Sequence, residues 1–335
     1  MPDDTRRGGR VPGIDGVLNI NKPDGMTSMD VVRHIKRASR QKRVGHGGTL
    51  DPFATGVIPV CLGQATRMME YLIDGTRVYR AVVELGVETD TYDVEGEVTA
   101  REDASGVKIE DIEAALEGFK GDIKQVPPMY SALKRNGKRL YELARAGIEV
   151  EREARDVEVH HIVVRNWSSP SFEIDVHCGR GFYMRSLAYD LGKILGCGGY
   201  LKSLERLRAG TFAIEDAVDL SEAERLFHDG GWEEMVSSLD SVVAHMKAAI
   251  VGKRIEEMIR NGRSLPPGLR IPLAQPGQQC RVYGVDGSFV AIMSFDPSAG
   301  RWKPDRVFNA GQNASGPREK SPAATGSTGE SERVS

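Results

Sequence analysis

One segment of the sequence, residues 45–57, constrains the chain most strongly, because it places glycines, a histidine and an aspartate directly before an apolar run. Glycines on both sides of His46 allow positive φ angles and a close approach of the backbone to a ligand. Asp51 precedes a proline, which biases its backbone towards an extended conformation. The run 56–60 predicts a buried strand. The pattern suits a polar side chain held on a loop by a rigid element, although an ordinary turn at Asp51 explains the composition more simply.

The remaining hydrophobic patterns predict an α+β domain with a mixed sheet over residues 13–246. Thr27 and Asp30 form a capping-box pattern that opens a helix, and Ser221 and Glu224 repeat the pattern later in the chain. Further helices are predicted at 65–73, 109–119 and 183–195. Strands are predicted at 16–20, 56–60, 78–85, 157–164 and 172–176.

The texture of the sequence changes near residue 247. A short helix is predicted at 253–261, followed by a hairpin of strands 280–284 and 288–293 that turns at Asp286-Gly287. Residues 247–308 therefore form a small β-rich module in this interpretation. The polar segment 1–12 and the Gly/Ser/Pro-rich tail 309–335 are predicted to be disordered.

The composition is that of a soluble globular protein of 335 residues, with 40% hydrophobic and 28% charged residues. No apolar run is long enough to span a bilayer, and the N-terminus lacks the apolar stretch of a signal peptide, so we expect a cytoplasmic protein. The four cysteines form no CxxC pair or zinc-type spacing, which predicts free thiols and no metal site.

The charges are segregated along the chain although the formal net charge is only −3. Basic residues crowd into 33–43 and 134–139, whereas acidic residues gather in 95–103, 110–117 and 222–234. Such segregation can present a positive face to phosphates despite the negative total. A set of solvated helix faces explains the same runs equally well.

Six collinear motifs between residues 14 and 215 resemble the TruB family of pseudouridine synthases. Apart from the glycine-rich segment and its continuation to Arg67, they lie at 16–28, 125–134, 137–142, 178–186 and 190–198. One short motif is weak support, but six in family order are specific. The resemblance implies a pseudouridine synthase fold, with a mixed, mostly antiparallel central sheet, a thumb-like insertion at about 125–152 and a PUA-like RNA-binding module at 247–308.

The resemblance also implies a catalytic set: Asp51 matches the catalytic aspartate, Tyr79 the active-site tyrosine, and Arg185 the arginine that pairs with the aspartate. Without the resemblance, the simpler interpretation of Tyr79 is a core aromatic of a strand, and that of Arg185 is a surface arginine of a helix. The family commonly has Lys-Gly-Thr-Tyr-Ile-Arg where this chain has residues 180–185. This departure keeps the tyrosine and the arginine and concerns local packing.

The substrate-binding set implied by the resemblance is His46, Leu204, Lys22 and Tyr183. His46 matches the histidine that fills the space left by the flipped nucleotide, Leu204 an apolar wall of the uracil pocket, and Lys22 a residue that steadies the site. The plainer interpretations are a histidine satisfied by nearby backbone and a leucine in the core.

The implied reaction converts the T-loop uridine of tRNA, at position 55, to pseudouridine. It breaks the N1–C1′ bond, rotates the base and joins C5 to C1′, which requires no cofactor and no metal. A carboxylate can attack C1′ or the base, or stabilise charge on the sugar, and the sequence leaves these paths open. The uridine must leave its stack to reach the carboxylate.

The expected partner is the T-arm stem-loop of tRNA. The implied RNA-binding residues are Lys134, Arg135, Lys138, Arg139 and Arg43. Cations interleaved with tyrosines suit RNA backbone contacts and stacking. We expect a monomer with no obligatory protein partner and no membrane association.

Two alternatives remain at this point. One is the related enzyme that acts within a guide-RNA ribonucleoprotein, although the insertion at 130–151 resembles the stand-alone bacterial form. The other is a non-catalytic RNA-binding or tRNA-folding protein that keeps the scaffold, which the intact Asp51, Tyr79 and Arg185 disfavour.

Overall fold

The computed structural model describes residues 13–135, 137–265 and 277–309. The chain divides into two compact units, Met1–Lys247 and Ala248–Ser335. The segments 1–12 and 309–335 are predicted to be disordered, and all of their residues except Asn309 lie outside the described part of the chain. Among the helices described, none combines the length and the apolar character needed to cross a membrane.

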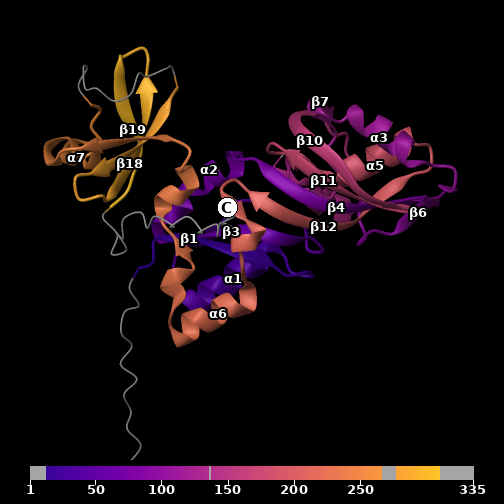
Figure 1. Ribbon diagram of the computed structural model, residues 1–335, viewed down its shortest axis with the longest axis horizontal. Coiled ribbons are helices and arrows are strands. Elements are labelled where there is room, and N and C mark those ends of the chain that lie inside the picture. The colour runs from indigo at the N-terminus through magenta and orange to yellow at the C-terminus, as the bar shows by residue number, and fades with distance from the viewer. Residues whose placement is uncertain (1–12, 136, 266–276, 310–335) are drawn as a thin grey trace, which may run out of the picture. The chain divides into compact units, whose positions relative to one another are not determined.

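The first unit is built on one large mixed sheet (Figure 1). Its main path runs β14-β1-β3-β12-β4-β11-β10-β7. The strands, in path order, are Val218–Asp219, Gly16–Lys22, Thr55–Leu62, Gly199–Ala209, Arg77–Leu85, Ser171–Cys178, Arg155–Ser168 and Gly121–Gln125. The pairs β1–β14 and β3–β12 are parallel and the other pairs on this path are antiparallel. The expected mixed, mostly antiparallel sheet is therefore confirmed.

Shorter strands extend this framework. β2 (Val44–His46), β13 (Phe212–Ala213) and β15 (Val236–Ser237) pair with β3, β12 and β1. Two separate ribbons are formed by β5 (Val87–Thr89) with β6 (Val98–Arg101), and by β8 (Lys134–Arg135) with β9 (Lys138–Arg139).

Two groups of helices bury the apolar side chains of the sheet. Strand β4 alternates buried and partly exposed residues, and its buried face packs with α3 (Ile109–Glu117) and α5 (Met184–Ile194) in one core. A second core joins β1 and β3 to α1 (Ser28–Ser39) and α6 (Leu220–Asp229). The short helices η1 (Gly63–Met68), α2 (Met69–Asp74) and α4 (Leu140–Arg145) lie between strands in the chain.

Helix α1 begins with the predicted capping box. The Oγ1 of Thr27 accepts a hydrogen bond from the Asp30 amide at 3.1 Å, and Oδ2 of Asp30 accepts from the Thr27 amide at 3.0 Å. The second predicted capping box is wrong. Helix α6 follows Asp219 without a side-chain cap, and Glu224 instead lies 2.8 Å from His34 of α1. The Glu224 side chain is thus taken up by a contact between helices.

The second unit contains a four-stranded sheet in the order β16-β17-β18-β19. Its elements are β16 (Lys247–Val251), α7 (Lys253–Arg260), β17 (Gln279–Gly284), β18 (Phe289–Asp296) and β19 (Arg301–Val307). Strands β17 and β18 form the predicted antiparallel hairpin. The core of the second unit contains Val282, Val290 and Trp302 from the sheet and Ile259 from α7. The expected small β-rich module is confirmed.

Replacing Thr27 by alanine removes the acceptor for the Asp30 amide and is expected to lower the free energy of unfolding by about 1 kcal/mol. Chemical denaturation measures this loss. Ser221→Ala is the matched control, because Ser221 is exposed and does not cap α6. The control should stay within about 0.5 kcal/mol of the parent chain. Equal losses in the two variants would contradict the assignment of Thr27 as the cap.

Candidate active site

The loop that carries Asp51 is fixed by hydrogen bonds from helix α1. The hydroxyl of Ser28, the first residue of α1, accepts from the Leu50 amide at 2.8 Å and donates to the Leu50 carbonyl at 3.1 Å. The Gly47 amide donates to the Pro59 carbonyl of β3 at 2.9 Å. The backbone directly before Asp51 is thus held by both α1 and the sheet, as a loop anchored by a rigid element should be.

Arg206 of β12 supports the same loop from inside the protein. Its guanidinium is fully buried and donates to the carbonyls of Val57 at 2.7 Å, Gly48 at 3.2 Å and Thr49 at 3.3 Å. Burial lowers the pKa of Arg206, and a hydrogen bond with the Tyr79 side chain opposes that shift. Arginine remains charged in proteins, so main-chain dipoles of the loop stabilise a buried cation here.

Gly56 makes this junction possible. Its φ is +96°, and a Cβ at this position would lie 2.4 Å from the Arg206 carbonyl oxygen. A larger residue would push β3 away from β12 and move the loop that precedes it.

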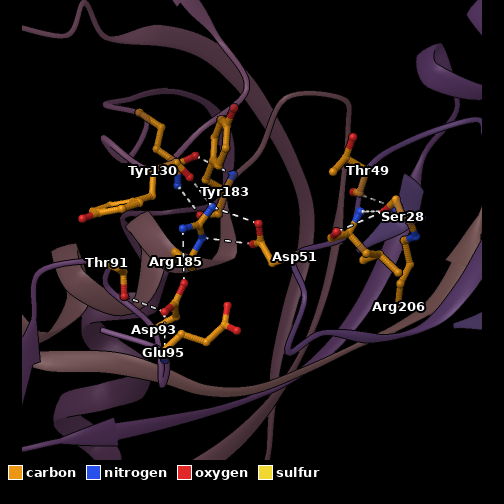
Figure 2. Close-up of polar contacts among 12 residues, drawn as sticks. Ser28, Thr49, Asp51, Thr91, Asp93, Glu95, Tyr130, Tyr183, Arg185 and Arg206 are labelled. Atoms are coloured by element: carbon orange, nitrogen blue, oxygen red, sulfur yellow. Dashed lines mark hydrogen bonds and ion pairs between the residues drawn. The ribbon is translucent and has the colours of Figure 1, made fainter. Parts of the chain in front are cut away.

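The centre of the site is an arginine shared by two carboxylates (Figure 2). Nη2 of Arg185 donates to Oδ1 of Asp51 at 3.1 Å, and Nε lies 3.0 Å from Oδ2 in an ion-pair contact. Nη1 of the same guanidinium lies 3.2 Å from Oδ2 of Asp93. Nη2 also donates to the Tyr130 carbonyl at 2.8 Å. The predicted pairing of Arg185 with Asp51 is present, with Asp93 as an additional partner.

Asp51 is accessible but poorly solvated. Its side chain keeps 31% of its surface open, whereas that of Asp93 keeps 3%. Burial of the carboxyl raises the pKa of Asp51, and the negative charge of Asp93 adds to the rise, while Arg185 and Lys22 oppose it. The pKa of Glu95 is also raised, by desolvation first and then by Asp93 and Asp51. Carboxylates crowded around one cation compete for it.

Lys22 holds the other side of the Asp51 loop. Its Nζ donates to the carbonyls of Met26 at 2.6 Å, Pro23 at 2.8 Å and Pro52 at 2.9 Å. Burial lowers its pKa to about 8, against the opposing charges of Asp24, Asp51 and Glu95. Lys22 is therefore a fully buried cation that fixes the carbonyl next to Asp51.

Tyr79 and Leu204 line the core side of the site. Both are buried in one apolar cluster with Leu50 and Ala54, which flank Asp51 in the sequence. Tyr79 of β4 lies opposite Arg206 of β12 in the antiparallel register. Tyr79 thus joins the site through its hydrogen bond with Arg206.

Tyr183 and His46 are the two remaining residues of the predicted substrate-binding set. The main chain of Tyr183 is clamped by Gln125, whose Nε2 donates to the Tyr183 carbonyl at 3.0 Å and whose Oε1 accepts from its amide at 2.8 Å. Burial raises the pKa of Tyr183. His46 ends β2, and burial followed by the charge of Arg206 lowers its pKa. The His46 imidazole is therefore neutral at neutral pH.

The predicted RNA-binding residues lie in exposed segments. Lys134 and Arg135 form β8, and Lys138 and Arg139 form β9 of the same ribbon. The Arg139 guanidinium lies 5.7 Å from the centroid of the Tyr141 ring. Arg43 is exposed just before β2.

Sequence reasoning missed Asp93 and Arg206. Arg206 lies two residues after Leu204 but was assigned no role, and Asp93 lies in a short turn without a periodic pattern. The one available signal for Asp93 was its place at the edge of the acidic run 95–103. No group of three or more His, Cys, Asp or Glu residues suited to a metal ion occurs in the described part of the chain.

Two family descriptions match adjoining parts of the chain. "TruB family pseudouridylate synthase (N terminal domain)" matches residues 36–184, and "tRNA pseudouridylate synthase B C-terminal domain" matches residues 185–251. Relatives named tRNA pseudouridine synthase B are similar over most of their length. The protein of Dehalococcoides mccartyi strain CBDB1 is 46% identical, over 88% of this chain and 97% of its own. That of Clostridium perfringens strain 13 is 45% identical, over 74% and 84%.

Solved structures share the fold at low sequence identity. The crystal structure of a Cbf5-Nop10-Gar1 complex has a TM-score of 0.67 at 24% identity, over 88% of this chain and 84% of the other. An H/ACA ribonucleoprotein bound to a substrate RNA containing 2′-deoxyuridine has a TM-score of 0.66 at 21% identity, over 92% and 93%. At these identities the likeness concerns the fold alone. The family matches and the extent of the similarity to its relatives show that the chain belongs to the TruB family of pseudouridine synthases.

Proposed function

We propose that this protein is a tRNA pseudouridine synthase that isomerises the T-loop uridine at position 55, with Asp51 as the essential carboxylate. The observation that carries the proposal is the two-point contact of Arg185 with Asp51 on the glycine-rich loop, in a chain of the TruB family. The names of the relatives support tRNA as the substrate.

The reaction rearranges bonds without net oxidation or reduction. The N1–C1′ bond breaks, the uracil turns, C5 joins C1′, and the proton on C5 leaves while N1 gains one. The Asp51 carboxylate acts at C1′ or at the base, or stabilises the positive charge that develops on the sugar. Arg185 fixes its orientation through a planar fork. Tyr79 offers a ring for stacking and a phenolic oxygen for a sugar proton.

The uridine reaches Asp51 by leaving its stack in the RNA loop. Unstacking costs a few kcal/mol, and a side chain that fills the vacated space recovers part of that cost. His46 serves this purpose as a neutral imidazole on the glycine-rich loop. Leu204 forms an apolar wall of the uracil pocket, Tyr183 contributes an aromatic ring, and Lys22 steadies the backbone beside Asp51.

RNA is held by the exposed cations. Lys134, Arg135, Lys138 and Arg139 on the β8–β9 ribbon contact the T-arm phosphates as part of a thumb spanning about 125–152, and Arg43 contributes near the loop. The module at 247–308 acts as a PUA-like RNA-binding domain. The enzyme works in the cytoplasm as a monomer, without an obligatory protein partner, cofactor or metal.

The purified chain alone should form pseudouridine in an unmodified T-arm transcript, as measured by tritium release from C5-labelled uridine and by mapping of the product. Asp51→Asn should bind the RNA yet lose roughly a thousandfold or more in turnover, because the ionised oxygen is removed. Undiminished tritium release by Asp51→Asn would remove Asp51 from its role. Activity that requires added guide RNA and partner proteins would support the ribonucleoprotein alternative instead.

The acid side of the rate profile should report Asp51. Because its folded-state pKa is raised, the active carboxylate is lost as pH falls through a value above the ordinary one of about 3.9. Asp93→Asn removes a neighbouring negative charge, so the pKa of Asp51 should fall and the acid limb should move to lower pH. Asp175→Asn is the matched control, since Asp175 pairs with Arg80 and Arg165 away from the site. An unmoved limb in Asp93→Asn would contradict the proposed competition for Arg185.

His46→Ala should reduce turnover by on the order of tenfold, corresponding to about 1.4 kcal/mol of lost support for the flipped state. Initial RNA binding, measured by filter retention, should change much less. His228→Ala is the control, because His228 is an exposed histidine of α6 that pairs with Asp229. Equal losses of binding and turnover in His46→Ala would show that His46 acts in docking rather than in base flipping.

A further inference from the structure

Helix α5 holds the segment 88–93 through three contacts spaced one helical turn apart. Arg185 pairs with Asp93 at 3.2 Å, the ring of Tyr189 stacks on that of Tyr92 with centroids 3.9 Å apart, and Nζ of Lys193 lies 2.7 Å from Oε1 of Glu88. Positions i, i+4 and i+8 lie on one face of a helix, so the three contacts form a ladder along α5. Only the first of them touches Asp51.

Tyr92 adopts a backbone conformation that bulky side chains avoid. Its φ is +65°, in the left-handed region. Its carbonyl accepts from the Leu201 amide of β12 at 3.0 Å, and its amide donates to the Thr89 carbonyl at 3.2 Å. The two rings are inclined by only 17°, so the stack has a defined geometry. Strain of this kind persists where surrounding contacts fix it, and it is common near functional sites.

This unusual turn sets the direction of Asp93. Oδ1 of Asp93 accepts from the Thr91 hydroxyl at 2.5 Å and from the Glu95 amide at 3.0 Å, which leaves Oδ2 for Arg185 (Figure 2). A shift of Tyr92 along α5 would therefore rotate Asp93. The rotation would change how strongly the Arg185 guanidinium interacts with Asp93 and with Asp51.

We propose that Tyr92 and Tyr189 are positioning residues for catalysis, which set the place of Asp93 on Arg185 and thereby the electrostatic state of Asp51. Lys193 and Glu88 secure the same segment one turn further along α5, where the Lys193 ammonium also lies 5.3 Å from the Tyr189 centroid. The proposal rests on the proposed role of Asp51. The charged and titratable groups that face Asp51 are Lys22, Arg185, Asp93, Glu95 and Tyr183.

The test compares Tyr189→Ala with Tyr189→Phe in the full chain acting on a T-arm transcript. The alanine variant loses the ring and should lower kcat about tenfold with KM within about twofold, because RNA contacts are untouched. Its acid limb should move to lower pH, as in Asp93→Asn, because Asp93 no longer competes fully for Arg185. The phenylalanine variant keeps the ring and should retain the parent kcat and limb. Tyr200→Ala, which removes a partly buried tyrosine of β12, is the control and should behave like the parent chain.

A second pair of variants tests the contact between Lys193 and Glu88 while keeping both tyrosine rings in the chain. Glu88→Lys alone places two cations together and should lower kcat, while Glu88→Lys combined with Lys193→Glu restores opposite charges and should recover most of it. A loss in Tyr189→Ala without movement of the acid limb, or an equal loss in Tyr189→Phe, would overturn the proposal. So would a charge swap that fails to recover kcat. Full turnover by Asp51→Asn would instead refute the underlying function, so the two failures are distinguishable.

Discussion

The rest of the site depends on the contacts that the buried guanidinium of Arg185 makes with its partners. An arginine removed from water is stable only when its charge is matched and its donors are occupied. Asp51 and Asp93 match its charge, and with the Tyr130 carbonyl they accept hydrogen bonds from its two Nη atoms; the three partners come from separate segments of the chain. Each segment is consequently held in place by the need to neutralise one cation. Loss of a single partner from such a buried pair typically costs about 3–5 kcal/mol. The contacts that orient Asp51 for catalysis are therefore also the contacts that stabilise the local fold.

Two other buried cations act on the backbone rather than on carboxylates. Lys22 and Arg206 donate mainly to carbonyls on either side of Asp51, which makes the loop rigid while leaving the carboxylate free for chemistry. Together with Arg185 they concentrate positive charge at the site of a chain whose net charge is −3. The carboxylates of Asp51, Asp93 and Glu95 balance these cations locally, so the site combines charges of both signs in a small volume.

The sequence predicted the framework where its patterns were regular. The alternation along β4 and the capping box at Thr27 are local signals, and both are present. Strand β12 was missed although it lies at the centre of the sheet. Register shifts at 201–203 and 206–208 space its buried residues by two and three positions in turn, which obscures the strand period. Such irregularities depend on the neighbouring strands and are invisible in one segment of sequence.

The candidate site likewise contains features that the sequence predicted and features that depend on contacts with other segments. The pairing of Arg185 with Asp51 followed from the family resemblance, whereas Asp93 depends on the left-handed turn at Tyr92, which no composition rule indicates for a tyrosine. The Ser221 pattern failed because α6 starts at Leu220, two residues earlier than a cap at Ser221 requires, and Glu224 contacts α1. The roles of Tyr79, His46, Leu204 and Tyr183 stay predictions until they are measured.

Three carbonyls enclose the Nζ of Lys22, so the chemical reactivity of this amine depends on opening of the loop that carries Asp51. With a pKa of about 8, against 10.5 for a free lysine, much of it is an uncharged nucleophile in mildly alkaline solution, yet none of its surface is exposed. An acylating reagent can reach the nitrogen only when the carbonyls of Pro23, Met26 and Pro52 separate. The rate of its modification relative to exposed lysines would therefore measure how often the segment beside Asp51 detaches from its support.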